Sequence, residues 1–134
     1  MVLKRYKGVA LVDTKRGILV VANRKRIFSL PGGGTNRGES RKDAIIRELE
    51  EETGLIGINA KYLFNYEGKE WKAHSGKIIK NYAKVFLVKV RGKAKPKHEI
   101  KHIAFWKEGS KIRISWRSKK LINAYLELKK DDKM

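Results

Sequence analysis

The sequence predicts one α/β domain over residues 1–134, with β-strands before and after a central helix. The chain length is typical of one domain, and no internal repeat or linker divides it. Short apolar runs recur from Val9 to Leu128, as expected for a series of buried elements. Between Ser40 and Gly54 the apolar residues follow the spacing of a helix, which places this helix between two groups of strands.

The segment before the helix is expected to form two strands followed by a glycine-rich break. Apolar runs predict buried strands at residues 5–12 and 18–22. Residues 13–17 and 23–26 are expected to be polar turns, and a short apolar run follows at 27–30. Pro31 and the three glycines after it are expected to interrupt regular structure.

The central helix carries recognisable signals at both ends. Ser40 is the expected N-cap, with Asp43 three residues later in a position that resembles a capping box. Gly54 is the expected C-terminal stop. The apolar side of the helix consists of Ala44, Ile45, Ile46 and Leu49.

The segment after the helix is expected to contain three strands and a second helix. The strands are expected at residues 58–68, 79–91 and 99–106. Residues 69–77 and 92–97 are polar or basic and are expected to be loops. An amphipathic helix is expected from Ser118 to Lys130, with its apolar stripe at Leu121, Ile122, Tyr125 and Leu126.

The chain is strongly basic, with a formal net charge of +19, but its acidic residues are concentrated. Six of the fourteen lie between Glu39 and Glu52. A positive field attracts polyanions, so one interpretation is an anionic substrate or an RNA partner. The other interpretation is a Lys-rich solvated surface of the kind found in heat-adapted proteins. The scattered distribution of lysine and arginine leaves both open.

Composition excludes several classes of site. The chain has no cysteine, which excludes disulfides and thiolate metal sites. No apolar stretch reaches the roughly 18 residues that suggest a membrane span, and the first five residues lack the apolar core of a secretory signal. We therefore expect a cytoplasmic protein with no membrane partner, and the oligomeric state is left open.

Carboxylates cluster along one turn of the central helix, within the segment from Gly33 to Leu55. Glu48, Glu51 and Glu52 share a face because residues three and four apart are neighbours on a helix. Their mutual repulsion is relieved when a divalent cation binds between them, and oxygen-only ligands favour Mg²⁺ or Mn²⁺. Alone, such a cluster is more often an exposed acidic face paired with lysines, so the spacing of the whole segment must decide.

That segment reads Gly33, five residues, Glu39, seven residues, and then Arg47-Glu48-Leu49-Glu50-Glu51-Glu52-Thr53-Gly54-Leu55. It resembles the Nudix box, G-x5-E-x7-R-E-U-x-E-E-x-G-U with U apolar, at every specified position. The resemblance implies a Nudix-type α/β/α sandwich with a mixed β-sheet. It also implies metal-dependent hydrolysis of a pyrophosphate bond in a nucleoside diphosphate linked to another group.

The resemblance assigns expected roles residue by residue. The expected metal ligands are Gly32 through its carbonyl, Glu39, Glu48, Glu51 and Glu52. Arg47 matches the arginine that orients a catalytic glutamate. The general base is left open between Glu52 or Glu51 of the box and an acid from a later loop, for which Glu99 is the leading choice.

Three functional hypotheses follow. The first is hydrolysis of a (deoxy)nucleoside triphosphate to monophosphate and pyrophosphate, with Arg5, Arg24 and Arg26 near phosphate and Trp71 stacking on a base. Phe64, Tyr66 and Tyr82 are alternative stacking residues. The second is action on RNA 5′ ends or dinucleoside polyphosphates, and the third is a non-catalytic RNA-binding module. ADP-sugar cleavage is a further enzymatic option.

Overall fold

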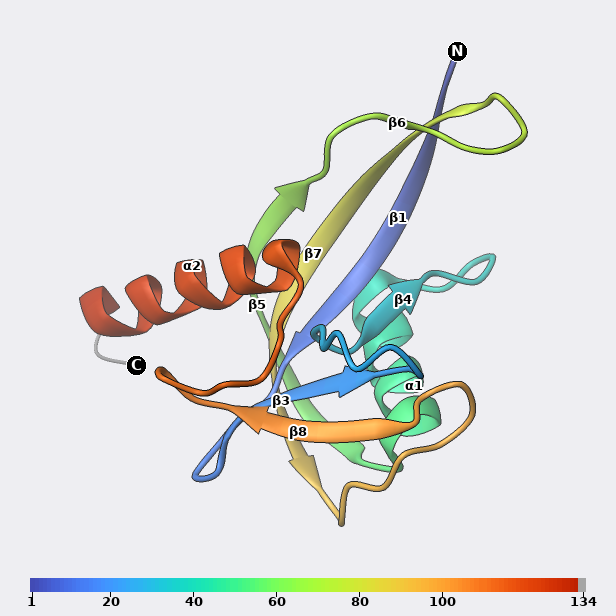
Figure 1. Ribbon diagram of the computed structural model, residues 1–134. Coiled ribbons are helices and arrows are strands. Elements are labelled where there is room, and N and C mark those ends of the chain that lie inside the picture. Colours follow the sequence, from blue (N-terminus) through green and yellow to red (C-terminus); the bar gives the residue numbers. More distant parts are fainter. Residues whose placement is uncertain (133–134) are drawn as a thin grey trace.

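The computed structural model describes residues 1–132 as two β-sheets and two helices (Figure 1). Residues 133–134 of the expected domain lie outside this range. The larger sheet has the strand order β4-β1-β7-β5, with β6 also paired to β7. Its strands are β1 (Val2–Leu11), β4 (Gly32–Gly34), β5 (Ile56–Glu67), β6 (Trp71–Lys72) and β7 (Ile78–Arg91). Strands β1 and β7 are parallel and the other pairs are antiparallel, so the expected mixed sheet is confirmed.

The smaller sheet is antiparallel and comprises β2 (Asp13–Thr14), β3 (Gly17–Ala22) and β8 (His102–Trp106). All six residues of β3 are buried, which explains why this segment is an uninterrupted apolar run. The two helices are α1 (Arg41–Thr53) and α2 (Trp116–Asp132).

The two helices cover opposite faces of the sheet region, which confirms the expected α/β/α layering (Figure 1). One core cluster joins α1, through Ile45 and Leu49, to the sheets at Phe86 and other buried residues. A second cluster joins α2, through Leu121 and Ile122, to Val85 on the opposite face of β7. Because side chains alternate along a strand, β7 contributes to both layers.

Both ends of α1 form as the sequence predicts. The Ser40 hydroxyl accepts a hydrogen bond from the Asp43 N–H at 3.0 Å, which satisfies one free donor of the first turn. Gly54 adopts φ 77° and donates its N–H to the Glu50 carbonyl at 2.8 Å, which ends the helix. The carboxylate turn is thus held between two capped ends.

Helix α1 lies very close to β1 at Gly8. A Cβ at this position would overlap the Ile45 side chain and lie 2.5 Å from the Arg41 carbonyl oxygen. Only glycine permits this approach, which brings the carboxylate turn against the sheet.

Four expected boundaries are wrong. The glycines at 32–34 do not interrupt the sheet but form β4, because they pair with Lys7–Val9 of β1. The expected loop at 69–77 contains β6, which pairs with β7. The strand expected from residue 99 begins at His102, because Lys97 to Ile100 forms a turn closed by an N–H···O bond of 3.1 Å. Helix α2 begins two residues earlier than expected.

Candidate active site

The glycine strand β4 brings the backbone into contact with the carboxylates of α1. A Cβ on Gly33 would lie 2.7 Å from the Glu48 carboxyl carbon, so a side chain at 33 would displace Glu48. Beside it, the Gly32 N–H donates to Glu52 Oε1 at 3.2 Å. Contacts between β4 and α1 therefore bring Gly32 close to the predicted metal-binding carboxylates of the helix.

Arg47 occupies the centre of this carboxylate cluster. Its guanidinium donates to both oxygens of Glu39 at 2.8 and 2.9 Å, a bidentate geometry that fixes both side chains. The same group reaches Glu48 Oε1 at 2.9 Å and both Glu51 oxygens at 3.2 Å. A fourth contact, to the Gly34 carbonyl at 3.2 Å, joins the helix to β4. Arg47 and Glu51, four residues apart on α1, therefore form an ion pair.

Glu39 reaches the cluster from the loop before the helix. Hydrogen bonds from the Arg47 side chain lower the pKa of Glu39 to about 2, with a further contribution from the Asn36 N–H. The same contacts, Glu39 foremost, raise the pKa of Arg47 above its ordinary value. Glu39 is thus held as a carboxylate beside the positive charge of Arg47.

Glu52 is in the opposite environment, since only 8% of its surface is exposed. Burial, the largest cause, and the negative charges of Glu48, Glu99 and Glu51 together raise the pKa of Glu52 to about 7. The hydrogen bond from the Gly32 N–H acts in the other direction. A carboxyl group with this pKa exchanges protons near neutral pH, which is the property a general base requires.

Glu99 approaches the cluster from the loop between β7 and β8. Its side chain is exposed, and its charge is among the causes that raise the pKa of Glu52. The loop is anchored to the end of α1 because the Lys97 N–H donates to the Glu52 carbonyl at 3.0 Å. The two alternatives for the general base therefore lie in one region, although Glu99 does not begin a strand.

The chemistry of this cluster fits a hard divalent cation. All the donors are oxygens, and Glu52 is a buried carboxyl group flanked by other negative charges, a conflict that a cation relieves. Within residues 1–132, no three acidic or histidine side chains already form a tight cage, because Arg47 holds Glu39, Glu48 and Glu51. A cation at Glu48 or Glu51 would compete with Arg47 for the same oxygens.

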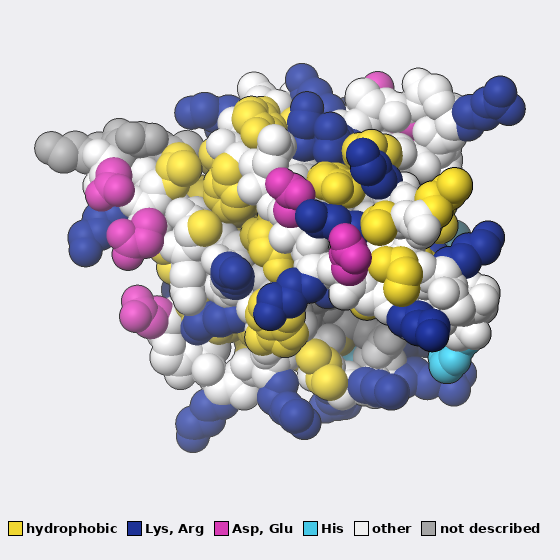
Figure 2. Space-filling model, turned by 90° about the horizontal axis from the view of Figure 1, so that it is seen from above, with side chains coloured by type: hydrophobic (Ala, Val, Ile, Leu, Met, Phe, Trp, Pro, Cys, Tyr) yellow, Lys and Arg dark blue, Asp and Glu magenta, His cyan; other side chains and the backbone are white. Residues whose placement is uncertain are grey.

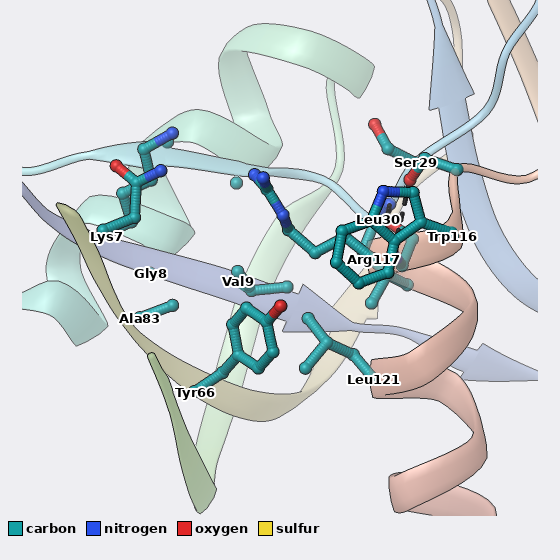
Figure 3. A pocket seen from close by; sticks show the side chains of 15 residues that line it. Lys7, Gly8, Val9, Ser29, Leu30, Tyr66, Ala83, Trp116, Arg117 and Leu121 are labelled. Carbon is teal, nitrogen blue, oxygen red and sulfur yellow. Dashed lines mark hydrogen bonds between the residues drawn. The ribbon is translucent and has the colours of Figure 1, made fainter. Parts of the chain in front are cut away.

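A cleft of about 360 Å³ opens beside the cluster, between the sheet and the start of α2 (Figure 3). This volume is in the range of small-molecule sites. Gly32 and Gly33 line it, so one end of the cleft meets the strand that contacts Glu48 and Glu52. The other walls include Lys7, Tyr66, Asn81, Trp116 and Arg117.

Lys7, Trp116 and Arg117 line this cleft, but the sequence had not indicated them as candidate site residues. Burial, together with the charges of Arg117 and Arg5, lowers the pKa of Lys7. Among the proposed stacking residues, Tyr66 lines the cleft, whereas Tyr82 stacks on Tyr6 with ring centroids 5.8 Å apart. Side chains alternate between the two faces of β1 and β7, and this alternation places Lys7 and Asn81 on the face covered by α2. The alternation can be read from the sequence.

The four residues expected to bind substrate are divided between two places. Trp71 lines a smaller hollow of about 290 Å³ that shares Lys7, Asn81 and Arg117 with the main cleft. The Arg5 guanidinium lies 5.8 Å from the centre of the Trp71 ring, on the same side. Arg24 and Arg26 are exposed on the turn after β3 and do not line the main cleft.

The basic residues do not gather in one patch on the face seen in Figure 2. Lysine and arginine side chains are distributed between exposed hydrophobic groups there, with few acidic ones. Neither helix of the described chain is long and apolar enough to cross a membrane.

Comparison with known proteins places these features in a family. The model of the NUDIX domain matches residues 3–124. An ADP-ribose pyrophosphatase of Methanocaldococcus jannaschii is 27% identical over 124 residues, covering 89% of this chain and 71% of that protein. An RNA pyrophosphohydrolase of Campylobacter jejuni subsp. doylei is 36% identical over 90 residues, covering 59% of this chain and 54% of that protein.

Solved structures give the same assignment. A crystal structure described as a nudix hydrolase family member from Chromobacterium violaceum superposes with a TM-score of 0.79 and 32% identity. The match covers 93% of this chain and 78% of the other. A MutT NUDIX hydrolase from Burkholderia pseudomallei shares the fold, with a TM-score of 0.72 and 19% identity. The chain therefore belongs to the Nudix family of pyrophosphohydrolases, enzymes that act on phosphoanhydrides.

Proposed function

We propose that this enzyme hydrolyses a nucleoside triphosphate to a nucleoside monophosphate and pyrophosphate, with Mg²⁺ or Mn²⁺ as its cofactor. The observation that carries the proposal is the continuity between the carboxylate cluster and the cleft. Gly32 and Gly33 line the cleft, and the same two residues contact Glu52 and Glu48. A nucleotide in the cleft would have its phosphates at the glycine end.

The basic residues of the cleft suit the phosphates. Lys7 and Arg117 line the same cleft as the glycines, and neither forms an ion pair with an acidic residue in the described chain. Their charges remain available to a phosphate, whose negative charge would offset the burial and the neighbouring positive charges that lower the pKa of Lys7.

Glu52 is our choice for the general base. Its buried carboxyl group lies beside the glycine end of the cleft, where it would accept the proton of the attacking water as the new P–O bond forms and the bridging P–O bond breaks. The Gly32 N–H holds Glu52 Oε1 at 3.2 Å. Arg47 would position Glu51 and Glu48, and Glu99 would modulate the charge beside Glu52.

The cation would be held by the Gly32 carbonyl and by the carboxylates of Glu39, Glu48, Glu51 and Glu52. When bound, a divalent cation neutralises phosphate charge and lowers the pKa of coordinated water. Removing it with EDTA should abolish turnover, and Mg²⁺ or Mn²⁺ should restore it.

A Glu52→Gln variant tests the proposal directly. With Mg²⁺ and a panel of nucleoside triphosphates, we expect its kcat to fall about 100-fold or more, because the proton acceptor is lost. Glu50→Gln is the matched control, since Glu50 lies on the same helix but is exposed and outside the Arg47 network. It should retain activity within about twofold. Hydrolysis in ¹⁸O-water identifies the phosphorus attacked, and a panel without any monophosphate product contradicts the proposal.

A second substrate class is favoured by the net charge of +19 and by the 36% identity to an RNA pyrophosphohydrolase. For triphosphorylated RNA, affinity should fall steeply as salt rises, because counterion release dominates binding to a polyanion. ADP-ribose belongs in the same panel because of the archaeal relative. The ratio of kcat/KM between free nucleotides, RNA ends and ADP-ribose decides among the three.

A further inference from the structure

Asn81 is a polar residue at a position where the fold buries apolar ones. It lies on β7 with only 8% of its surface exposed, and it shares its face with Ile79, Ala83 and Val85. Its side-chain oxygen Oδ1 is buried and has no hydrogen-bond partner among the described residues. A buried acceptor without a donor destabilises a folded protein, so an apolar residue would be preferred here on stability alone.

The surroundings of Asn81 indicate a ligand that supplies the missing donor. Asn81 lines both the main cleft and the smaller hollow beyond it, so it lies where the two join. Tyr66 and Trp116 line the same two spaces, and Trp116 is 64% exposed. Flat aromatic walls around one enclosed acceptor match a planar ring that carries an N–H group on its edge.

The residues along the cleft are arranged in an order that suits the phosphates and the base of a nucleotide. Gly32 and Gly33 lie at the end that contacts the carboxylates, where the proposed function places the phosphates. Asn81 and Tyr66 lie on β7 and β5, where the cleft continues toward Trp71. A base bound at Asn81 would therefore be attached to phosphates at the glycine end.

We propose that Asn81 is a specificity-determining residue whose Oδ1 accepts a hydrogen bond from the exocyclic amino group of the substrate's nucleobase. The inference rests on the proposed function and names the class of base: one with an amino group, such as adenine or cytosine. An exocyclic amino group projects from the ring edge and can reach an enclosed acceptor. In uracil the ring N–H is flanked by two carbonyl oxygens, which would approach Asn81 together with the donor.

The test combines a change in the substrate with a change in the protein. Adenosine triphosphate is compared with purine riboside triphosphate, which differs by the absence of the amino group, and cytidine triphosphate with its 2-pyrimidinone analogue. In the parent enzyme we expect kcat/KM to be about 10- to 100-fold higher for the amino-bearing member of the pair, the effect of one buried unpaired acceptor. In Asn81→Leu, which has no acceptor, the two members should be hydrolysed at similar rates.

Two further variants separate recognition from a structural effect. Asn81→Asp keeps an acceptor at the same place and should retain the preference for the amino group. Asn59→Leu alters an exposed asparagine on the neighbouring strand β5 and should leave the preference unchanged. Thermal unfolding gives a readout independent of activity: Asn81→Leu should be at least as stable as the parent, because an unpaired buried acceptor is removed.

The outcomes are distinct. If the parent enzyme hydrolyses none of these nucleotides, the proposed function fails. If it hydrolyses both members of each pair equally well, or if Asn81→Leu keeps the preference, the assignment of Asn81 is overturned while the proposed function stands. If Asn81→Leu does not fold, Asn81→Ala provides the same comparison of substrates, and the loss of folding contradicts the expected gain in stability.

Discussion

The two carboxyl groups at the ends of the cluster show how environment, not residue type, decides charge. Glu39 accepts two hydrogen bonds from Arg47, and its pKa is about 2. Glu52 is buried away from that guanidinium, and its pKa is about 7. One group is thus a permanent anion, whereas the other changes its protonation near neutral pH. This difference supports our proposal that Glu39 acts as a fixed anion and Glu52 as the proton acceptor.

Glu52 should make the stability of the metal-free protein depend on pH. Its pKa rises from 4.5 when unfolded to about 7 when folded, so the folded state binds more protons between these values. The free energy of unfolding should therefore fall as pH rises through this window, by up to about 3 kcal/mol. Urea unfolding in EDTA at pH 5 and pH 8 measures the change.

Two comparisons check the cause of that pH dependence. Glu52→Gln should reduce the fall between pH 5 and pH 8, and the exposed Glu50→Gln control should keep it. Mg²⁺ at pH 8 should raise the unfolding midpoint of the parent, because it binds only the folded cluster. An unchanged pH dependence in Glu52→Gln would show that other groups cause it.

At the scale of elements, the site depends on the contact between β1 and α1. Gly8 on β1 meets Ile45 and the Arg41 carbonyl with no room for a side chain. Strand β4 pairs with β1, and its Gly33 lies against Glu48. Strand β1 is therefore the element that sets the distance between the carboxylate turn and the cleft.

Gly8→Ala should destabilise the protein by about 2–3 kcal/mol, since its methyl group would overlap Ile45 and the backbone of Arg41. Gly34→Ala is the matched control on β4, because a Cβ there meets no atom closer than 4.0 Å. Denaturant unfolding compares the two variants with the parent. Equal stability of Gly8→Ala and Gly34→Ala would mean that α1 is free to move away from β1.

For the whole molecule, the formal net charge of +19 works against the compact state. The five ion pairs within the described residues use five acidic side chains: Asp13, Glu39, Glu48, Glu51 and Glu67. Three of these pair with Arg47 alone. Most lysines and arginines therefore repel one another through solvent. Such repulsion is long-ranged and is reduced by salt.

Raising NaCl from about 0.05 to 0.3 M should therefore increase the thermal midpoint of the metal-free protein, because shorter screening lengths weaken the repulsion. The same salt should raise the KM for nucleoside triphosphates, since it also screens the attraction of a polyanion. Calorimetry and steady-state kinetics in the same buffers measure both. A midpoint that falls with salt would show that ion pairs outweigh repulsion.

The local signals in the sequence were sufficient for α1 and its carboxylates. Ser40 and Gly54 end the helix through contacts within a few residues, so their roles follow from the sequence order alone. The same holds for the ion pair between Arg47 and Glu51, which are four residues apart on one helix. Family membership was also predictable, because the Nudix box is contained in one short segment.

The remaining features depend on residues far apart in the chain. Gly32–Gly34 became a strand because β1 lies beside it, and the cleft joins Lys7, Asn81 and Arg117 from three separate elements. The helix, its charges and the family could be predicted from residue order, since these features arise from neighbours along the chain. The burial of Glu52 and the unpaired oxygen of Asn81 could not, because burial and hydrogen bonding depend on what packs against a side chain.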